Sequence, residues 1–301
     1  MKDVLKTLTV LILALGCEPK PSKPIAVDTS FRIGLISDCQ YCDCETRGKR
    51  HYRASKDRLS EAVKTLNNFS LKYTIHMGDF IDRDFNSYDT LIPIWNQLKS
   101  KKYHVLGNHD FEVEETLKSS IFEKLNIQNR YYSFAEGNWR FIVLDGNDLS
   151  FHGGLTEEKK KQTDSLYNSL KDEDLEYMQK WNGGLSQMQL NWVKSELELA
   201  TKNKESVGFY CHFPIYPEEI HNLWNRKDLM DLISQYSCVK LYINGHNHAG
   251  AYEAINGIHF LTLKGMVETA DNSSFAMATF SKDTVLIRGY GREISRKLVI
   301  D

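Results

Sequence analysis

Five short apolar runs in this sequence each end in residues of the types that bind metal ions. Taken singly, an aspartate after a strand is usually a turn residue or a helix cap, and a histidine is usually an ordinary core or surface residue. Five such endings, in order along one chain, are better explained by one shared site. The predicted metal ligands are Asp38, Gln40, Asp79, Asn108, His212, His246 and His248.

The number of these ligands indicates two metal ions. Two carboxylates, two amide oxygens and three imidazoles exceed the four ligands of one tetrahedral zinc site. They suit two divalent ions about 3.5–4 Å apart that share a carboxylate and hold a hydroxide as nucleophile for displacement at phosphorus. His109 is one residue out of phase with Asn108. We therefore expect His109 to face the scissile phosphate and to donate a proton or a hydrogen bond to the leaving oxygen.

The elements that position these ligands are predicted to be interior β-strands with helices between them. Each apolar run is bounded by turn residues, and ligand crevices form at the carboxyl ends of strands in α/β sheets. The predicted strands are Phe31–Ile36, Tyr73–Met77, Tyr103–Leu106, Val207–Cys211 and Val239–Ile243, and the predicted helices are Tyr52–Phe69 and Ser186–Asn203. Ser186 and Gln189 have the spacing of a capping box.

The spacing within the motifs also suggests their local geometry. Asp38 and Gln40 are two residues apart, so in an extended segment both side chains point the same way. The same holds for His246 and His248. We expect the glycines beside the ligands to let the backbone turn sharply, and these are Gly78, Gly107 and Gly245.

Size and composition indicate a soluble globular protein with a sizeable core. The chain has 301 residues, of which 41% are hydrophobic and 26% charged. The formal net charge of -2 provides no electrostatic footprint for nucleic acid, so we expect a small-molecule substrate instead.

The N-terminus has the features of a secretory signal. Lys2 and Lys6 precede an apolar run, Leu8–Leu15, that ends at Gly16 and Cys17. This run is too short to span a membrane, and the alternative of a buried helix lacks a polar face. We expect residues 1–17 to be a signal peptide with lipoprotein-type cleavage at Cys17, which becomes lipidated. Residues 18–30 then form a proline-rich tether to a domain over 31–301, on an exported bacterial cell-envelope lipoprotein on the periplasmic or surface side.

Three cysteines, Cys39, Cys42 and Cys44, lie close together after the first motif. A metal cluster would need a fourth ligand and a second cysteine pair. For an exported protein we expect a local disulfide or free thiols at these positions instead.

The ordered motifs resemble those of the calcineurin-like metallophosphoesterase superfamily. They are Asp38-x-Gln40, Gly78-Asp79-x-x-Asp82, Gly107-Asn108-His109-Asp110, His212 and Gly245-His246-x-His248. The superfamily usually opens with Asp-x-His. Gln40 in the third place is similar to the manganese-dependent ADP-ribose/CDP-alcohol diphosphatases. Further segments that resemble this family are Arg50–Arg53, Trp181–Gly184, Ser186–Trp192, His212–Pro217, Trp224–Arg226 and Gly265–Thr269, so the likeness extends from Phe31 to Arg292.

The resemblance implies an α/β fold of two packed mixed β-sheets flanked by helices, the calcineurin-like four-layer sandwich. It also implies that the enzyme cleaves the diphosphate bond of ADP-ribose or CDP-alcohols. One metal would take Asp38, Gln40, Asp79 and His248, and the other Asp79, Asn108, His212 and His246. The amide oxygen of Gln40 favours manganese or magnesium by ligand type, with Fe²⁺ and Zn²⁺ as alternatives.

Several other residues are candidates for binding the substrate. Arg50 and Arg53 suit a second phosphate, although they are also typical of an exposed helix start. Tyr41, Phe213 and Trp224 could stack on a nucleobase or belong to the core. Residues Thr156–Lys180 are rich in charge and predict a solvated helical cap.

Other functions remain as alternatives to the diphosphatase. One is a phosphodiesterase or phosphomonoesterase of the same superfamily. A purple acid phosphatase is disfavoured because its iron-binding tyrosine would fall at Asp82. An inactive nucleotide-binding protein of the envelope would be expected to lack ligands, and every ligand position here holds a competent donor. A structural envelope protein leaves the ligands unexplained.

Overall fold

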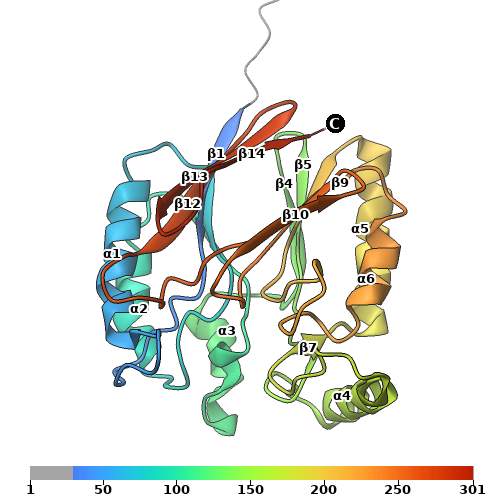
Figure 1. Ribbon diagram of the computed structural model, residues 1–301, viewed down its shortest axis with the longest axis horizontal. Coiled ribbons are helices and arrows are strands. Elements are labelled where there is room, and N and C mark those ends of the chain that lie inside the picture. Colours follow the sequence, from blue (N-terminus) through green and yellow to red (C-terminus); the bar gives the residue numbers. More distant parts are fainter. Residues whose placement is uncertain (1–29, 301) are drawn as a thin grey trace, which may run out of the picture.

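Two six-stranded mixed β-sheets lie face to face at the centre of the protein, in a computed structural model that describes residues 30–300 (Figure 1). The predicted signal peptide over 1–17, Cys17 and the tether over 18–30 lie outside the described residues, except for Ser30. No helix between residues 30 and 300 is both long and apolar enough to cross a membrane.

The first sheet has the order β14-β13-β12-β1-β2-β3. Its parallel strands β1, β2 and β3 carry the first three motifs, and β12 pairs antiparallel with β1. The first and last strands of the described residues, β1 and β14, therefore belong to one sheet. The strands are β1 (Phe31–Ile36), β2 (Tyr73–His76), β3 (Lys101–His104), β12 (Ser274–Phe280), β13 (Thr284–Gly291) and β14 (Arg296–Val299).

The second sheet has the order β10-β11-β9-β8-β5-β4. Its parallel strands β8 and β9 carry the histidine motifs. The strands are β4 (Tyr132–Glu136), β5 (Trp139–Val143), β8 (Ser206–Tyr210), β9 (Val239–Asn244), β10 (Ala251–Ile255) and β11 (Ile258–Thr262), and a separate small sheet contains β6 (Leu149–Ser150) and β7 (Gly183–Gly184).

Helices cover the outer face of each sheet and complete the four layers. Figure 1 shows α1 and α2 outside the first sheet and α5 and α6 outside the second. The helices are α1 (Ser55–Leu66), α2 (Ser87–Trp95), α3 (Ser120–Lys124), α4 (Glu157–Leu170), α5 (Gln187–Asn203) and α6 (Arg226–Ile233), with short 3-10 turns at Tyr52–Ala54, His109–Phe111, Glu115–Leu117 and Lys171–Glu173.

The central strands are largely apolar because both of their faces are buried. In β1, Ile33 and Leu35 join the core between the sheets, whereas Ile36 joins the core under α1 and α2. This is why strands of such sheets are recognised as continuous apolar runs. The predicted fold class is confirmed, and the predicted strands agree with the observed ones to within about two residues, the usual uncertainty of element ends.

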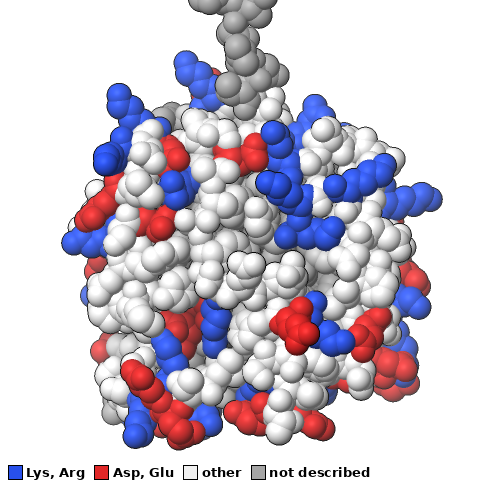
Figure 2. All heavy atoms as spheres, turned by 180° about the vertical axis from the view of Figure 1, so that it is seen from behind, with Lys and Arg blue, Asp and Glu red and all other residues white. Residues whose placement is uncertain are grey.

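The predicted helix caps are confirmed in part. The Ser186 side chain caps α5 by accepting a hydrogen bond from the backbone N–H of Gln189. The reciprocal half of a capping box is absent, because the Gln189 side chain is buried and bonds to the backbone of Asp145. The charged stretch Thr156–Lys180 is helical only as far as Glu173, through α4 and its following turn. The rest of the predicted helical cap is irregular, and Tyr177 and Met178 within it are buried. Seen from behind, the surface mixes both signs of charge around a largely uncharged middle (Figure 2).

Candidate metal centre

The strand-end motifs of the two sheets meet in one pocket. A cavity of about 330 Å³ is lined by residues that include Asp79, Asn108, His109, His246 and His248. Asp38, Asp79 and Asn108 come from the first sheet, and the histidines after β8 and β9 come from the second. A site of this kind exists only when both sheets are packed together.

Two groups of possible metal ligands share one carboxylate. One is Asp79, His212 and His246, and the other is Asp38, Asp79 and His248. Within each group the ligand atoms lie within 4.8 Å of one another, and all are buried. The geometry therefore places Asp79 where a carboxylate could bridge two cations.

Three buried oxygen atoms in this centre lack a hydrogen-bond donor among the described residues. They are Oε1 of Gln40, Oδ2 of Asp79 and Oδ1 of Asn108. The Gln40 amide nitrogen donates to Oδ1 of Asp82 at 3.1 Å, which fixes the orientation of that side chain. Leaving a buried acceptor unpaired costs about 1–3 kcal/mol. Oxygens of this kind fit a hard divalent cation such as Mn²⁺ or Mg²⁺.

Hydrogen bonds outside the centre set which nitrogen of each histidine is free. Nδ1 of His212 lies 2.8 Å from the Met77 carbonyl oxygen, and Nδ1 of His248 lies 3.1 Å from Oε1 of Glu268. Because these partners are acceptors, both Nδ1 atoms carry the hydrogen, and the lone pairs of both Nε2 atoms face inward.

Asn182 plays the same part for His246. Both hydrogens of its amide nitrogen go to the carbonyl oxygens of Tyr177 and Ile220. Its Oδ1 therefore faces Nε2 of His246, at 2.8 Å, as an acceptor. Nε2 of His246 carries the hydrogen, and Nδ1 is left for a metal.

These tautomers bring electron-rich atoms together. Nε2 of His212 lies 3.2 Å from Oδ2 of Asp79, and Nδ1 of His246 lies 3.1 Å from the same nitrogen. Nε2 of His248 lies 3.3 Å from Oδ1 of Asp38. Lone pairs at such distances require a cation between them. The residues present therefore fit a pair of metal ions.

Without metal, protons can supply part of that charge. Burial disfavours a charged His212, but the negative charge of Asp79 outweighs burial and raises the pKa of His212 to about 9. Burial would raise the pKa of Asp79, but the imidazoles of His212 and His109 outweigh it and hold the pKa below its usual value. Burial and the nearby His212 lower the pKa of His246, which stays neutral. In the metal-free protein the centre therefore combines ionised carboxylate, a protonated His212 and a neutral His246.

The backbone at the motifs differs from the extended geometry expected from sequence. Asp38, Gln40, Asp79 and His246 all have positive φ, of 51°, 43°, 54° and 68°. The prediction that Asp38 and Gln40 point the same way because their segment is extended is therefore wrong. Non-glycine residues adopt this region only where the surroundings hold them, and such strain gathers at functional sites.

The glycines beside the ligands act in two different ways. Gly78 has a φ of 98°, as a sharp turn requires. A Cβ at Gly107 would lie 2.1 Å from Oδ1 of Asp79, and one at Gly245 would lie 2.6 Å from Oδ2 of Asp38. These two positions need glycine because a carboxylate of the centre occupies the space beside them.

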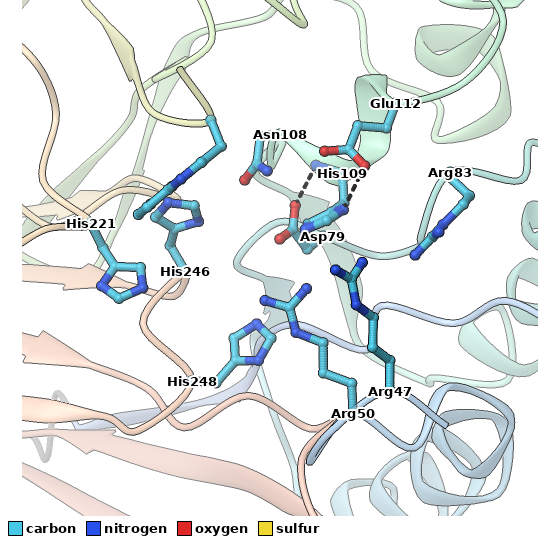
Figure 3. A pocket seen from close by; sticks show the side chains of 11 residues that line it. Arg47, Arg50, Asp79, Arg83, Asn108, His109, Glu112, His221, His246 and His248 are labelled. Carbon is cyan, nitrogen blue, oxygen red and sulfur yellow. Dashed lines mark hydrogen bonds and ion pairs between the residues drawn. The ribbon is translucent and has the colours of Figure 1, made fainter. Parts of the chain in front are cut away.

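His109 lines the pocket between acidic neighbours. Its backbone N–H donates to Oδ1 of Asp79 at 2.9 Å (Figure 3). Its Nδ1 lies 3.0 Å from both Oδ1 of Asp82 and Oε2 of Glu112. Burial would lower the pKa of His109, but the charge of Asp79 and these hydrogen bonds outweigh it and hold the pKa well above its usual value. A protonated His109 in the pocket can donate a proton.

Of the two predicted substrate arginines, the pocket contains only one. Arg50 lines the cavity. Arg53 is exposed, forms ion pairs with Asp43 and Glu45 at 2.5 and 2.8 Å, and is not among the lining residues. The prediction that Arg53 faces the substrate is not met by this geometry. Sequence reasoning also missed Arg47 and Arg83, which line the pocket with Arg50.

The aromatic residues also differ from the prediction. Phe213 and Trp224 are fully buried in hydrophobic clusters, so neither can stack on a ligand. Tyr41 packs against the core under α1. The pocket is instead lined by Trp181, beside His221.

The cysteines after the first motif form a local disulfide. Cys42 is bonded to Cys44, and Cys39 is a buried free thiol. Neither disulfide sulfur is a thiolate that could hold a metal, so no cysteine cluster forms here. The disulfide lies in the loop between Gln40 and the pocket arginines.

Comparison with known proteins agrees with this architecture. The family model of calcineurin-like phosphoesterases matches residues 31–250. The chain is 30% identical, over 88% of its length and 97% of the relative, to the manganese-dependent ADP-ribose/CDP-alcohol diphosphatase of Danio rerio, and 29% identical to that of Homo sapiens over 91% and 95%. A crystal structure of a dimetal phosphatase from Danio rerio has a TM-score of 0.81 and 28% identity, covering 90% of this chain and 99% of that one.

The chain therefore belongs to the calcineurin-like phosphoesterase family. The predicted enzyme class, a dinuclear-metal phosphoesterase, is confirmed.

Proposed function

We propose that this chain hydrolyses the diphosphate bond of nucleoside diphosphate derivatives, such as ADP-ribose and CDP-alcohols, with manganese. The observation that carries the proposal is the shared carboxylate Asp79 between two ligand groups, with arginines beside it in the pocket. Relatives about 30% identical over nearly the whole chain are named for this activity and this metal. The products would be a nucleoside monophosphate and a second phosphomonoester.

The ligand sets of the proposal follow the two groups. Asp38, Gln40, Asp79 and His248 would hold one ion, and Asp79, Asn108, His212 and His246 the other. When bound, such a pair neutralises phosphate charge and lowers the pKa of a coordinated water. The protein's own part is to orient these ligands through Asn182, Glu268 and the Met77 carbonyl, and to keep the carboxylates ionised.

His109 is the proposed proton donor. It lies in the pocket, outside both ligand groups, and Asp82 and Glu112 keep its imidazole charged and oriented. A proton given to the leaving oxygen would let the second phosphomonoester depart as a monoanion instead of a dianion. Arg50 would hold the second phosphate through charge-assisted hydrogen bonds.

A substrate panel tests the proposal. ADP-ribose, CDP-choline, a dinucleoside polyphosphate and an aryl monophosphate are compared with Mn²⁺ and with Mg²⁺. We expect the highest kcat/KM for ADP-ribose or CDP-choline with Mn²⁺. If the aryl monophosphate were cleaved as efficiently, the general phosphoesterase of the same family would be the better description.

We also propose that the protein is exported and anchored to the bacterial cell envelope by a lipid on Cys17. The support is the short apolar run that ends at Gly16 and Cys17 behind two lysines. A palmitate analogue should label the wild type but not Cys17→Ser. Protein that stays in the cytoplasm with Met1 intact would refute the anchor.

A further inference from the structure

The pocket has two walls of different chemistry. On one side lie three arginines, Arg47 and Arg50 from the loop after β1 and Arg83 from the loop after β2; we refer to these as the cationic wall. On the other side lie Trp181 and His221, the aromatic wall, from segments next to β7 and α6. Figure 3 shows the arginines on one side of Asp79 and His221 on the other. The candidate metal centre lies between the walls.

The cationic wall has charge to offer a ligand. Among the described residues, the side chains of Arg47 and Arg50 form no hydrogen bond or ion pair, whereas Arg83 is held by Asp82. Figure 3 shows both guanidinium groups directed toward Asp79 and His109. That of Arg50 also lies close enough to Glu268 to contribute, after His248, to the lowered pKa of the Glu268 carboxyl. Paired guanidinium groups bind the oxygens of a phosphate bidentately.

The aromatic wall offers ring faces instead of charge. The ring of Trp181 lies 5.1 Å from that of His221 and 5.2 Å from that of His246. Trp181 is only partly buried, and His221 is tied to Glu219, with 2.6 Å between Nδ1 and Oε2. A fixed, partly exposed indole is a stacking surface for a nucleobase.

We propose that the pocket binds its substrate in one direction, with the nucleoside on Trp181 and the far phosphate on Arg47 and Arg50. This inference rests on the proposed function. It goes further by stating which of the two phosphorus atoms is attacked. The phosphate between the walls is then the one attached to the nucleoside.

The reaction follows from this orientation. An oxygen from water forms a bond to the nucleoside phosphorus, and the bond from that phosphorus to the bridging oxygen breaks. The far phosphate leaves with the bridging oxygen, on the side where His109 can protonate it. ADP-ribose would give AMP that contains the water oxygen, and ribose 5-phosphate that does not.

Hydrolysis in H₂¹⁸O tests the orientation directly. Mass spectrometry of the products of ADP-ribose should find the label in AMP alone. Label in ribose 5-phosphate, or in both products, would overturn the orientation while leaving the diphosphatase intact. Absence of any hydrolysis of ADP-ribose would instead overturn the proposed function.

Binding of the two products provides a readout independent of turnover. By calorimetry on the manganese-loaded protein, Trp181→Ala should weaken AMP binding about 5- to 150-fold, the range for loss of one stacked base. It should leave ribose 5-phosphate binding unchanged. Arg47→Ala should weaken the binding of ribose 5-phosphate about tenfold and leave the binding of AMP unchanged.

Matched controls separate these effects from misfolding. Trp192→Ala removes another partly buried tryptophan, which packs on Tyr131 away from the pocket, and should change neither affinity. Trp181→Phe should restore AMP binding. If Trp181→Ala weakened the binding of both products equally, the assignment of the aromatic wall to the nucleoside would be overturned.

Discussion

Nε2 of His246 lies 2.8 Å from Oδ1 of Asn182, and the amide hydrogens of Asn182 are both used by backbone carbonyls. This pairing decides which nitrogen of His246 can bind a metal. Asn182→Ala should therefore lower the affinity for Mn²⁺ by about 10- to 100-fold, the usual effect of losing such a partner. Calorimetric titration of the metal-free variant would measure it. An unchanged affinity would show that Asn182 only holds its loop.

Metal content tests the shared carboxylate. Protein purified without chelator should contain about two divalent ions per chain. Because Asp79 belongs to both ligand groups, Asp79→Ala should lose both ions and activity together. His248 belongs to only one of the two ligand groups, so the His248→Ala variant should retain about one ion per chain. A wild-type content of one, with activity surviving in Asp79→Ala, would contradict the two-metal centre.

The role of His109 can be read from leaving groups. His109→Ala should keep both metals while kcat for ADP-ribose falls by about 10²- to 10⁴-fold. A substrate that releases an alkoxide needs the proton more than one that releases a phosphate dianion, whose conjugate acid has a pKa of about 6, so its turnover should fall further. Equal losses on both substrates would assign the His109 side chain to positioning its neighbours instead of to proton transfer.

The two arginines near the first motif should behave differently. Arg50→Ala should reduce kcat/KM for ADP-ribose by about 10- to 100-fold, because one charge-assisted contact to a phosphate is lost. Arg53→Ala is the matched control and should leave it unchanged, since Arg53 pairs with Asp43 and Glu45 on the surface. A larger loss of kcat/KM in Arg53→Ala than in Arg50→Ala would mean that the loop changes conformation when the substrate binds.

The ion pair of Asp148 makes part of the stability depend on pH. Burial would raise the pKa of Asp148, but hydrogen bonds from Lys159 and Ser186 hold it below its usual value. A carboxyl group with a lowered folded pKa stabilises fully above its unfolded pKa of about 4, and this stabilisation is lost as pH falls through the folded value.

Asp148→Asn should therefore lower the Tm at pH 7, and the gap to wild type should narrow toward pH 3. Thermal unfolding in the presence of chelator excludes a contribution from metal release. Asp164, exposed on helix α4, which also carries Lys159, provides the control: Asp164→Asn should show no such gap. A gap for Asp148→Asn that stayed constant with pH would contradict the pairing.

The ligands could be predicted from sequence because each follows its strand within a few residues. A strand such as β1 is buried along nearly its whole length, so its end at Ile36 is visible in the sequence, and Asp38 lies two residues further on. The carboxyl ends of parallel strands meet at one edge, which brings distant motifs together without further information. The fold class followed from the same pattern and from the resemblance.

The partners of the ligands could not be predicted in this way. Asn182 and Glu268 lie in irregular segments, where no periodicity tells which side chain points inward. Their roles depend on hydrogen bonds to His246 and His248, which lie 64 and 20 positions away in the sequence. Such pairings are set by tertiary packing alone.

Arg53 was wrongly grouped with Arg50 as a substrate residue. For Arg53 the alternative, an exposed helix start, describes the structure, since it lies in the 3-10 helix Tyr52–Ala54. In the structure a backbone bridge joins Arg47 to Arg50, and α1 begins only at Ser55. That bridge turns Arg47 and Arg50 toward the pocket and leaves Arg53 outside. Spacing in the sequence does not report such a turn.

The pairing of β1 with β12 has a consequence for how the protein is made. The loop that holds Asp38 follows a strand whose neighbour is more than two hundred residues further along the chain. The first sheet can close only after nearly the whole chain has been synthesised, because contacts this distant form last. The ligands of both ions can come together only after the chain has been made at least as far as His248, the last of them in the sequence. Most of the chain is therefore synthesised before the complete set of ligands exists.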